Sequence, residues 1–436
     1  MPNHGRVSSD AIDQNGMSMT RMGCCTAGVA ALFLMAWFTP LAATSALVVA
    51  PEQHEADGYT RYELLTPSTH QFRISYEITE TTAGATDYYN PIRPGSTASD
   101  ERVIDRATGE PLAFEEVGAI VATAGGVSDA KPADRFIAVH LRRPVTPGGG
   151  ARILIEKTYL DAASYHDAQA GEMVFERSLG IKRNAVVLPP GYVLTSCNYP
   201  SQVLRQADGR IAIAFWNDTS GPAPLKLTAR VAALAPGGTA PAVTKLLDER
   251  AHQNRNIVYR LDQPETHSFA LTHDYTESRP GIASYVNIVR GGSIARDPSA
   301  TDLDTGERLR SREVRGDAVR LAEPDAIDVT GETVAILFDF APVRPGTSRR
   351  LRIAETYTDL ARYGVIDGGL VWHRSLGRAD NAVILPRGWA LTNSSVPATV
   401  STTGNGQTRL DFINPRTDEI DTVITARQLI GAHVER

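Results

Sequence analysis

Two long stretches of the sequence are copies of one another. Residues 177–200 and 374–397 are identical at 13 of 24 aligned positions, at an offset of 197 residues. Unrelated segments of ordinary composition would share about one or two. Shorter matches at an offset of 197 or 198 residues include Thr69-His70 with Thr266-His267, Thr108-Gly109-Glu110 with Thr305-Gly306-Glu307, and Tyr159 with Tyr357. A period this long exceeds that of any solenoid or propeller repeat, so each copy is expected to be a domain-sized unit.

The duplication sets the expected domain organisation. The first repeat is predicted over residues 57–235 and the second over residues 254–434. Residues 236–253 form the expected linker, which begins with the turn-rich sequence Pro-Gly-Gly-Thr-Ala-Pro. Residues 1–46 precede both repeats and carry a different pattern.

Each repeat has the pattern of β-structure. Apolar and polar residues alternate along 72–78 and 225–231, as they do in a half-buried strand. Asp208-Gly209 and Asn405-Gly406 lie at equivalent positions between strand-like segments and suit two-residue hairpin turns. No long stretch has a sustained helical period. We therefore predict an all-β fold with two tandem homologous β-sandwich domains of immunoglobulin-like packing, after an N-terminal signal or anchor segment.

The N-terminal segment is typical of a targeting element. Arg21 precedes residues 23–50, which carry no formal charge, and the most apolar part is followed by small residues. This order indicates a secretory signal with cleavage after Ala46. The alternative is an uncleaved anchor, because 28 uncharged residues are long enough to span a bilayer. Both predict a periplasmic or extracellular protein, with any membrane attachment made by this segment.

Composition and motifs argue against several functions. The chain has 44 Lys+Arg against 50 Asp+Glu, so there is no basic excess for binding nucleic acid. Cys24 and Cys25 lie in the targeting segment, which leaves Cys197 alone, aligned with Ser394. Zinc-helix, nucleophile-elbow and phosphate-loop motifs are missing from the sequence. We therefore expect neither a bound metal nor a cofactor, and a small packing role for Cys197 rather than nucleophilic catalysis.

A retained arginine needs a partner. Arg177 and Arg374 are equivalent, and a buried guanidinium usually bonds a carboxylate or a carbonyl oxygen. The candidate carboxylates are Asp161 and Asp359, or Glu110 and Glu307. We expect a structural pair in each repeat; the alternative is a ligand contact made twice.

Other retained residues also suggest backbone roles. Asn184 and Asn381 are expected to bond local backbone at the start of a strand. Gly180 and Gly377, or Gly191 and Gly388, are expected to mark backbone positions that exclude a Cβ atom. The fold shared by the two repeats is the simplest reason for keeping these residues.

Residues that differ between the repeats are candidates for a specific role. Three aromatic residues occur only in the first: Tyr89, Tyr199 and Trp216, which align with Val286, Val396 and Ile413. Strand alternation puts Trp216 on a face that is polar in the second repeat, away from the main core. We consider these three aromatics as binding residues, with Trp216 a stacking platform for a sugar or an anchor for a protein. Packing of Trp216 against the other repeat is the alternative.

The sequence therefore favours a binding protein. We expect an exported, non-catalytic cell-envelope or secreted protein whose two β-sandwich modules present loops and faces to a protein or glycan partner. One alternative is a hydrolase of envelope polymers that uses paired carboxylates, which a sequence alone does not bring together. Another is a structural subunit of a larger envelope assembly.

Overall fold

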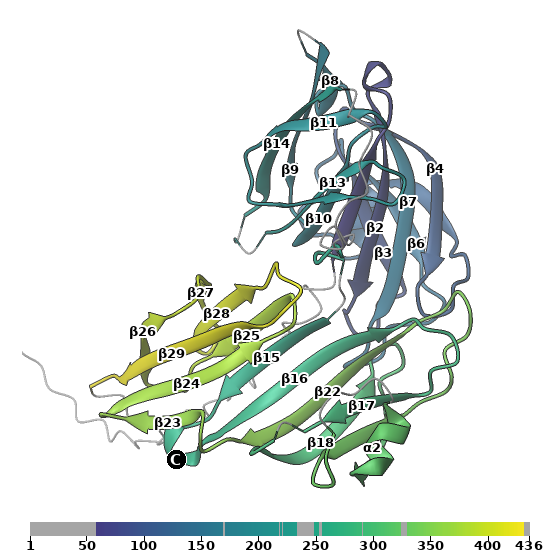
Figure 1. The fold of residues 1–436 in the computed structure, drawn as a ribbon. Helices are drawn as coiled ribbons and strands as arrows, with labels where there is room; N and C mark the ends of the chain where they lie inside the picture. The colour runs from purple at the N-terminus through teal and green to yellow at the C-terminus, as the bar shows by residue number, and fades with distance from the viewer. Residues whose placement is uncertain are drawn as a thin grey trace, which may run out of the picture. The chain divides into compact units, whose positions relative to one another are not determined.

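The computed structural model describes residues 58–168, 171–217, 219, 221–232, 248–252, 255–289, 291–323 and 329–430. The predicted signal or anchor segment and most of the predicted linker lie outside these residues. Almost all the regular structure is β-strand, and the α-helices α1 (Ala119–Ala124) and α2 (Asp317–Ala322) are single short turns (Figure 1). Within the described ranges, no helix has the length and apolar character needed to cross a membrane.

The first repeat contains three sheets. Its strands are β1 (Tyr59–Leu64), β2 (Gln71–Glu80), β3 (Asp87–Ile92), β4 (Thr97–Asp105), β5 (Phe114–Gly118), β6 (Arg135–His140), β7 (Ala151–Leu160), β8 (Tyr165–Asp167), β9 (Glu172–Leu179), β10 (Arg183–Val187), β11 (Tyr192–Cys197), β12 (Gln202–Arg205), β13 (Ile211–Trp216) and β14 (Ala223–Val231). The long sheet has the order β12-β13-β10-β1-β2-β7-β4, and the two small sheets are β11-β14-β9-β8 and β3-β6-β5.

The second repeat has the same plan. Its strands are β15 (Arg255–Leu261), β16 (Ser268–Glu277), β17 (Ser284–Ile288), β18 (Ile294–Asp302), β19 (Glu307–Arg308), β20 (Arg310–Arg315), β21 (Val334–Asp339), β22 (Arg349–Thr358), β23 (Tyr363–Ile366), β24 (Gly369–Leu376), β25 (Asp380–Ile384), β26 (Trp389–Ser394), β27 (Thr399–Thr402), β28 (Thr408–Ile413) and β29 (Ile420–Gln428). Its sheets run β19-β18-β22-β16-β15-β25-β28-β27, β23-β24-β29-β26 and β17-β21-β20. The predicted fold class, two homologous β-sandwiches in tandem, is confirmed.

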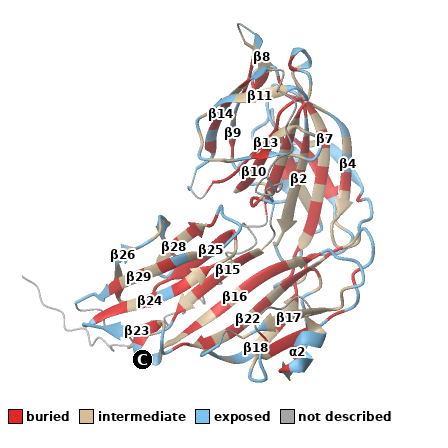
Figure 2. Ribbon diagram, in the orientation of Figure 1, coloured by how far each residue is buried: buried red, intermediate tan, exposed pale blue. Residues whose placement is uncertain are grey.

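The core of each repeat lies between the long sheet and the two small sheets. In the first repeat, Phe72 and Ile155 of the long sheet share one apolar cluster with Phe175 and Val139 of the small sheets. Burial alternates along β2 and β14 as the sequence predicted (Figure 2). The long sheets also contain one parallel pair each, β1 with β10 and β15 with β25, among antiparallel neighbours.

The retained Thr-His pairs form a turn that joins the sheets. His70 and His267 have left-handed backbones, with φ of 55° and 53°, at the end of a short 3-10 turn. Nδ1 of His70 lies 3.0 Å from the carbonyl oxygen of Tyr165, and His267 makes the same contact with Tyr363, 2.6 Å away. Each histidine therefore ties β2 or β16 to the edge of the neighbouring small sheet.

The predicted hairpins are present, with longer loops. Strands β12 and β13, and β27 and β28, pair antiparallel around the Asp-Gly and Asn-Gly sequences. The amide of Gln206 donates to the carbonyl oxygen of Arg210, so the loop contains three residues instead of the predicted two. Gly209 and Gly406 have φ of 84° and 82°, which explains the glycine.

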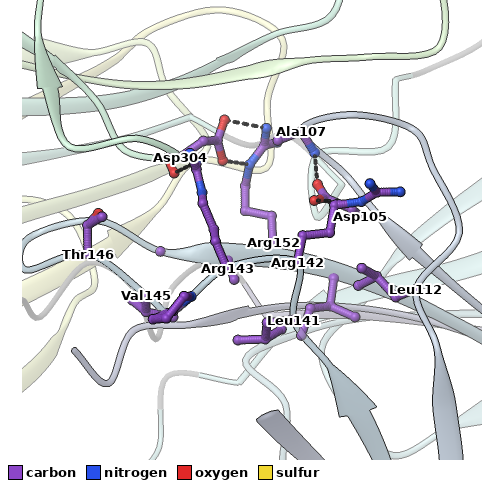
Figure 3. Close-up of a pocket in the computed structure, with 14 residues that line it drawn as sticks. Asp105, Ala107, Leu112, Leu141, Arg142, Arg143, Val145, Thr146, Arg152 and Asp304 are labelled. Atoms are coloured by element: carbon purple, nitrogen blue, oxygen red, sulfur yellow. Dashed lines mark hydrogen bonds and ion pairs between the residues drawn. The ribbon is translucent and has the colours of Figure 1, made fainter. Parts of the chain in front are cut away.

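One buried ion pair links the two repeats. Nε and Nη2 of Arg152 donate to the two carboxylate oxygens of Asp304, at 2.5 and 2.7 Å (Figure 3). Arg152 is 8 % exposed and Asp304 7 %, counted on the side chains. Arg152 also donates to Ser348 Oγ and to its carbonyl oxygen. The hollow drawn in Figure 3 encloses only about 30 Å³, room for about one or two water molecules, so it is a packed contact.

Candidate functional site

A cavity of about 530 Å³ opens in the first repeat, within the range of small-ligand sites. Its floor is formed by side chains of β1, β2 and β7 in the long sheet. Its walls are the end of β3 with residues 91–94, and the end of β9 with residues 177–181. We call it the first-repeat cavity.

A lysine lies at the floor of this cavity. Lys157, on β7, is 6 % exposed, and its ammonium group donates to Oδ1 of Asn90 on β3. Its Nζ also lies 4.8 Å from the centroid of the Tyr159 ring. Burial lowers the pKa of Lys157 to about 8, with a further contribution from the charge of Arg177, so the amine is mostly charged at neutral pH.

The predicted partner of Arg177 is present. Its Nη1 lies 2.8 Å from Oδ2 of Asp161 and donates to that oxygen. The guanidinium carbon lies 5.6 to 5.9 Å from the ring centroids of Tyr62, Phe72 and Tyr159. The charge of Arg177 is therefore balanced by a carboxylate and covered by aromatic rings.

The rim of the first-repeat cavity is also cationic. Arg93 and Lys131 are exposed at the rim, and Asp134 is the carboxylate among the described lining residues. Because Asp161 balances Arg177, the ammonium of Lys157 and the two rim cations leave an excess of positive charge facing the cavity. Such a site favours an anionic ligand.

The second repeat has a cavity of about 380 Å³, the second-repeat cavity, whose lining only partly corresponds to that of the first and does not include Glu355. Asn287, the counterpart of Asn90, lines it and donates from Nδ2 to Oε1 of Glu355, 2.7 Å away. Glu355 aligns with Lys157 at an offset of 198 residues. It is 4 % exposed, and burial raises its pKa. The same position therefore carries opposite charges in the two repeats.

Arg374 repeats the environment of Arg177 with a looser ion pair. Its guanidinium carbon lies 5.2 to 5.5 Å from the rings of Tyr259, Phe269 and Tyr357. Its Nη1 is 3.8 Å from Oδ2 of Asp359, whereas Arg362 approaches the same oxygen to 3.1 Å. The predicted structural pair thus occurs in both repeats, at different distances.

The expectation that Trp216 offers an exposed stacking face is wrong. Trp216 is 7 % exposed and belongs to an apolar cluster that includes Ala212 and Ala214. Ala379 of the second repeat is part of the same cluster, and Ile413 packs against it. Trp216 instead packs against the second repeat, as the alternative prediction stated.

The other two aromatic candidates lie apart from each other. Tyr199 packs against Phe215, with ring centroids 4.8 Å apart, and its hydroxyl donates to Oδ1 of Asn217. Tyr89 is half-buried on β3, and its hydroxyl lies over Gly125 at the end of α1. Neither lines the first-repeat cavity, so the structure does not bring the three candidates together.

The retained asparagines have the expected geometry. Nδ2 of Asn184 donates to the carbonyl oxygen of Ile181 at 2.7 Å, and Nδ2 of Asn381 to that of Arg378 at 2.8 Å. Each bond closes the turn that leads into β10 or β25.

The expectation for Gly180 and Gly377 is wrong. An ideal Cβ on Gly180 would contact nothing within 4 Å, and one on Gly377 would meet the flexible side chain of Glu419, with Cγ nearest at 3.3 Å. Neither glycine has a positive φ. The retained glycines that need their backbone freedom are Gly191 and Gly388, with φ of 79° and 81°.

Cys197 and Ser394 have the same local role. Sγ of Cys197 lies 3.3 Å from the carbonyl oxygen of Tyr199, and Oγ of Ser394 donates to that of Val396 at 2.7 Å. Each side chain stabilises the turn after β11 or β26, which explains why both are small and able to donate a hydrogen bond.

Neither cavity contains a recognisable catalytic arrangement among its described lining residues. Asp134 has no second carboxylate beside it in the first-repeat cavity, and Glu277 of the second-repeat cavity is bonded to Arg279. In the described part of the chain, no three His, Cys, Asp or Glu residues group as a metal site.

Comparisons with known proteins give distant likenesses. No family model and no curated protein matches the sequence. An M1 zinc metallopeptidase structure from Deinococcus radiodurans is 12% identical, with a TM-score of 0.27 over 45% of this chain and 50% of that chain. The collagen adhesin CNA from S. aureus is 7% identical, with a TM-score of 0.16 over 71% of this chain and 81% of that chain. A putative protease from Parabacteroides distasonis is 11% identical, with a TM-score of 0.25 over 85% and 92% of the two chains.

These likenesses are limited to the β-rich fold. The chain spans about half the length of the metallopeptidase structures that it matches. At such TM-scores, none of the three structures supports an argument about activity.

Sequence reasoning missed Lys157 and Asn90. The signal was available, because Lys157 and Glu355 differ in charge beside the retained Thr-Tyr pair at 158–159 and 356–357, and Asn90 is retained as Asn287. What the sequence lacked was the pairing of β3 with a different sheet from β7, which places the two side chains within bonding distance across the cavity.

Proposed function

We propose that the protein is an exported, non-catalytic binding protein, and that its first-repeat cavity takes an acidic saccharide. The observation that carries the proposal is the ammonium of Lys157, which is buried at the cavity floor and bonded to an amide oxygen. Among the described residues, no carboxylate forms an ion pair with it. A buried charge is stabilised by an opposite charge, and a ligand carboxylate would supply one.

The shape and lining of the cavity support a saccharide in particular. A volume of about 530 Å³ suits one or two sugar rings better than the broad surface of a folded protein partner. Tyr62, Tyr76 and Tyr159 contribute aromatic surface, and Asn90 contributes an amide. This combination of apolar rings with a few polar groups is typical of sites that orient a small ligand.

The test is binding of oligosaccharides to the full chain by titration calorimetry. Wild-type protein should bind uronic-acid oligosaccharides and not their neutral counterparts. Lys157→Met keeps the apolar stem and removes the charge, and it should weaken binding by about tenfold or more. Lys226→Met is the matched control, since Lys226 is half-exposed and pairs with Glu176 outside the cavity.

Two outcomes would contradict the proposal. One is the failure of the wild-type protein to bind any acidic saccharide. This outcome contradicts the proposal even if the protein is found to bind a protein partner. The other is equal affinity of wild-type and Lys157→Met protein. Release of shortened products during the titration would point to hydrolysis.

Export is a separate part of the proposal. It rests on the charge and apolar pattern of residues 1–46. Expression of the full chain followed by cell fractionation and N-terminal sequencing tests it. A mature protein outside the cytoplasm, starting after Ala46 or retaining the segment as an anchor, supports export, and retention in the cytoplasm contradicts it.

A further inference from the structure

Two arginines face the second-repeat cavity, and no carboxylate in the described part of the chain pairs with either of them. Arg255 is the first residue of β15, and Arg378 lies in the turn between β24 and β25. The guanidinium of Arg255 lies over Tyr275, 4.2 Å from the ring centroid. Across the described residues, neither arginine has an ion pair with a carboxylate within 4.0 Å. Their charges are therefore available to a ligand.

The nearby carboxylate is already occupied. Glu277 accepts hydrogen bonds from Nε and Nη2 of Arg279, at 3.0 and 2.7 Å, and from the hydroxyl of Tyr275. Burial alone would raise the pKa of Glu277, but the bonds from Arg279 and Tyr275 lower it to about 2. Glu323 also lines the cavity, at the end of α2, and lies beyond ion-pair distance of Arg255 and Arg378.

The two arginines are close enough to repel one another. Burial lowers the pKa of Arg378, and the charge of Arg255 lowers it further. Burial lowers the pKa of His273, and the charges of Arg378, Arg255 and Arg350 lower it further. An arrangement of like charges costs stability unless an anion lies between them.

The shared fold does not require this pair. Arg255 aligns with Gly58 and Arg378 with Ile181, so the first repeat builds the same strands without either charge. The first repeat places its cation on the cavity floor instead, at Lys157. The arginine pair is therefore specific to the second repeat, as expected of residues kept for a ligand.

We propose that Arg255 and Arg378 form an oxyanion-binding site in the second-repeat cavity. The guanidinium fork matches both carboxylate and phosphate oxygens, so the site takes a small ligand that carries one of these groups. The volume of about 380 Å³ fits a single small ligand. This site is separate from the saccharide site of the first repeat.

The experiment measures thermal unfolding of the full chain with inorganic phosphate, with glucuronate and with chloride at equal ionic strength. Wild-type protein should unfold a few degrees higher with at least one of the two oxyanions than with chloride, because a ligand that binds the folded state stabilises it. Arg255→Met and Arg378→Met should each lose that shift. Arg416→Met, at an exposed pair with Asp418, should keep it. A response to phosphate alone assigns a phosphate ligand, and a response to glucuronate assigns a carboxylate.

A second readout separates binding from a structural role. Without an oxyanion, Arg378→Met should unfold at the wild-type temperature or above it, because a repulsion has been removed. If Arg378 instead stabilised the fold, the Arg378→Met substitution would lower the unfolding temperature. The proposal is overturned if wild-type protein responds to neither oxyanion at about 20 mM, or if both variants keep the full shift. Lys157→Met should leave the response unchanged, which keeps this result independent of the saccharide test.

Discussion

Lys157 and Glu355 occupy equivalent positions on β7 and β22, and each hydrogen-bonds the asparagine retained opposite it. Asn90 accepts from the lysine through its carbonyl oxygen, whereas Asn287 donates to the glutamate through its amide nitrogen. An asparagine side chain has both groups and needs only to be turned over. One scaffold position therefore accommodates a buried lysine in the first repeat and a buried glutamate in the second.

The buried ammonium of Lys157 predicts a gain of stability at alkaline pH. Burial lowers its pKa from 10.5 to about 8 in the folded state. Below pH 8 both states are charged and the cost of burial is present in full. Between pH 8 and 10.5 the unfolded state holds more protons, so the free energy of unfolding rises, by at most about 3 kcal/mol from this group. Denaturant unfolding of wild type and Lys157→Met at pH 7 and pH 10 measures this change in unfolding free energy.

The tyrosines also change the unfolding free energy at alkaline pH, but they are the same in Lys157→Met and wild type. Their contribution therefore cancels when the two proteins are compared. The difference in unfolding free energy between Lys157→Met and wild type should shrink as the pH rises. A difference that is constant from pH 7 to pH 10 would contradict the assignment.

Glu355 predicts the opposite dependence. Burial raises its pKa above 4.5, so the folded state binds more protons and stability falls as the pH rises through this range. Its Oε2 is buried, and none of the described residues forms a hydrogen bond to it. Glu355→Gln removes the charge and should stabilise the protein at pH 7 by roughly 1–2 kcal/mol. The gain should vanish below about pH 4, and an equal gain at pH 3.5 and pH 7 would argue against burial of the charge as its cause.

The local pattern of the sequence was enough to predict the class of fold. Alternation along 72–78 and 225–231 reports directly which side chains face a core, and the duplication shows that the pattern belongs to one unit built twice. Gly209 and Gly406 likewise report a local requirement, a positive φ in a hairpin loop.

Long-range pairing was the part that the sequence did not contain. Alternation correctly placed Trp216 away from the main core, but Ala379 and Ile413 cover it from the other repeat, more than 160 positions away. Lys157 and Asn90 meet because strands of different sheets face each other across a cavity. Nothing local in either segment reports such contacts.

Two glycines of the first repeat should respond differently to alanine. Gly191 has φ of 79°, a conformation that costs an L-residue about 1–2 kcal/mol, so Gly191→Ala should lower the free energy of unfolding by about that amount. Gly180 has an ordinary φ and open space around its Cβ position. Gly180→Ala should therefore change stability by less than about 0.5 kcal/mol. Thermal unfolding of both variants is the measurement, and a larger loss for Gly180→Ala would show a constraint that the geometry lacks.

Removing one member of the Arg152–Asp304 pair should destabilise the contact between the repeats. Asp304→Ala leaves the Arg152 guanidinium buried beside Ser348 without this carboxylate, and loss of one member of a buried ion pair costs roughly 3–5 kcal/mol. Arg152→Ala should cost a similar amount, because the buried Asp304 carboxylate loses the guanidinium that balances its charge, although the backbone N–H of Arg350 still donates to it. The double variant should recover part of the loss, since neither charge is then stranded. Calorimetric unfolding of the three variants measures the coupling, and strictly additive losses would mean that the two side chains do not depend on each other.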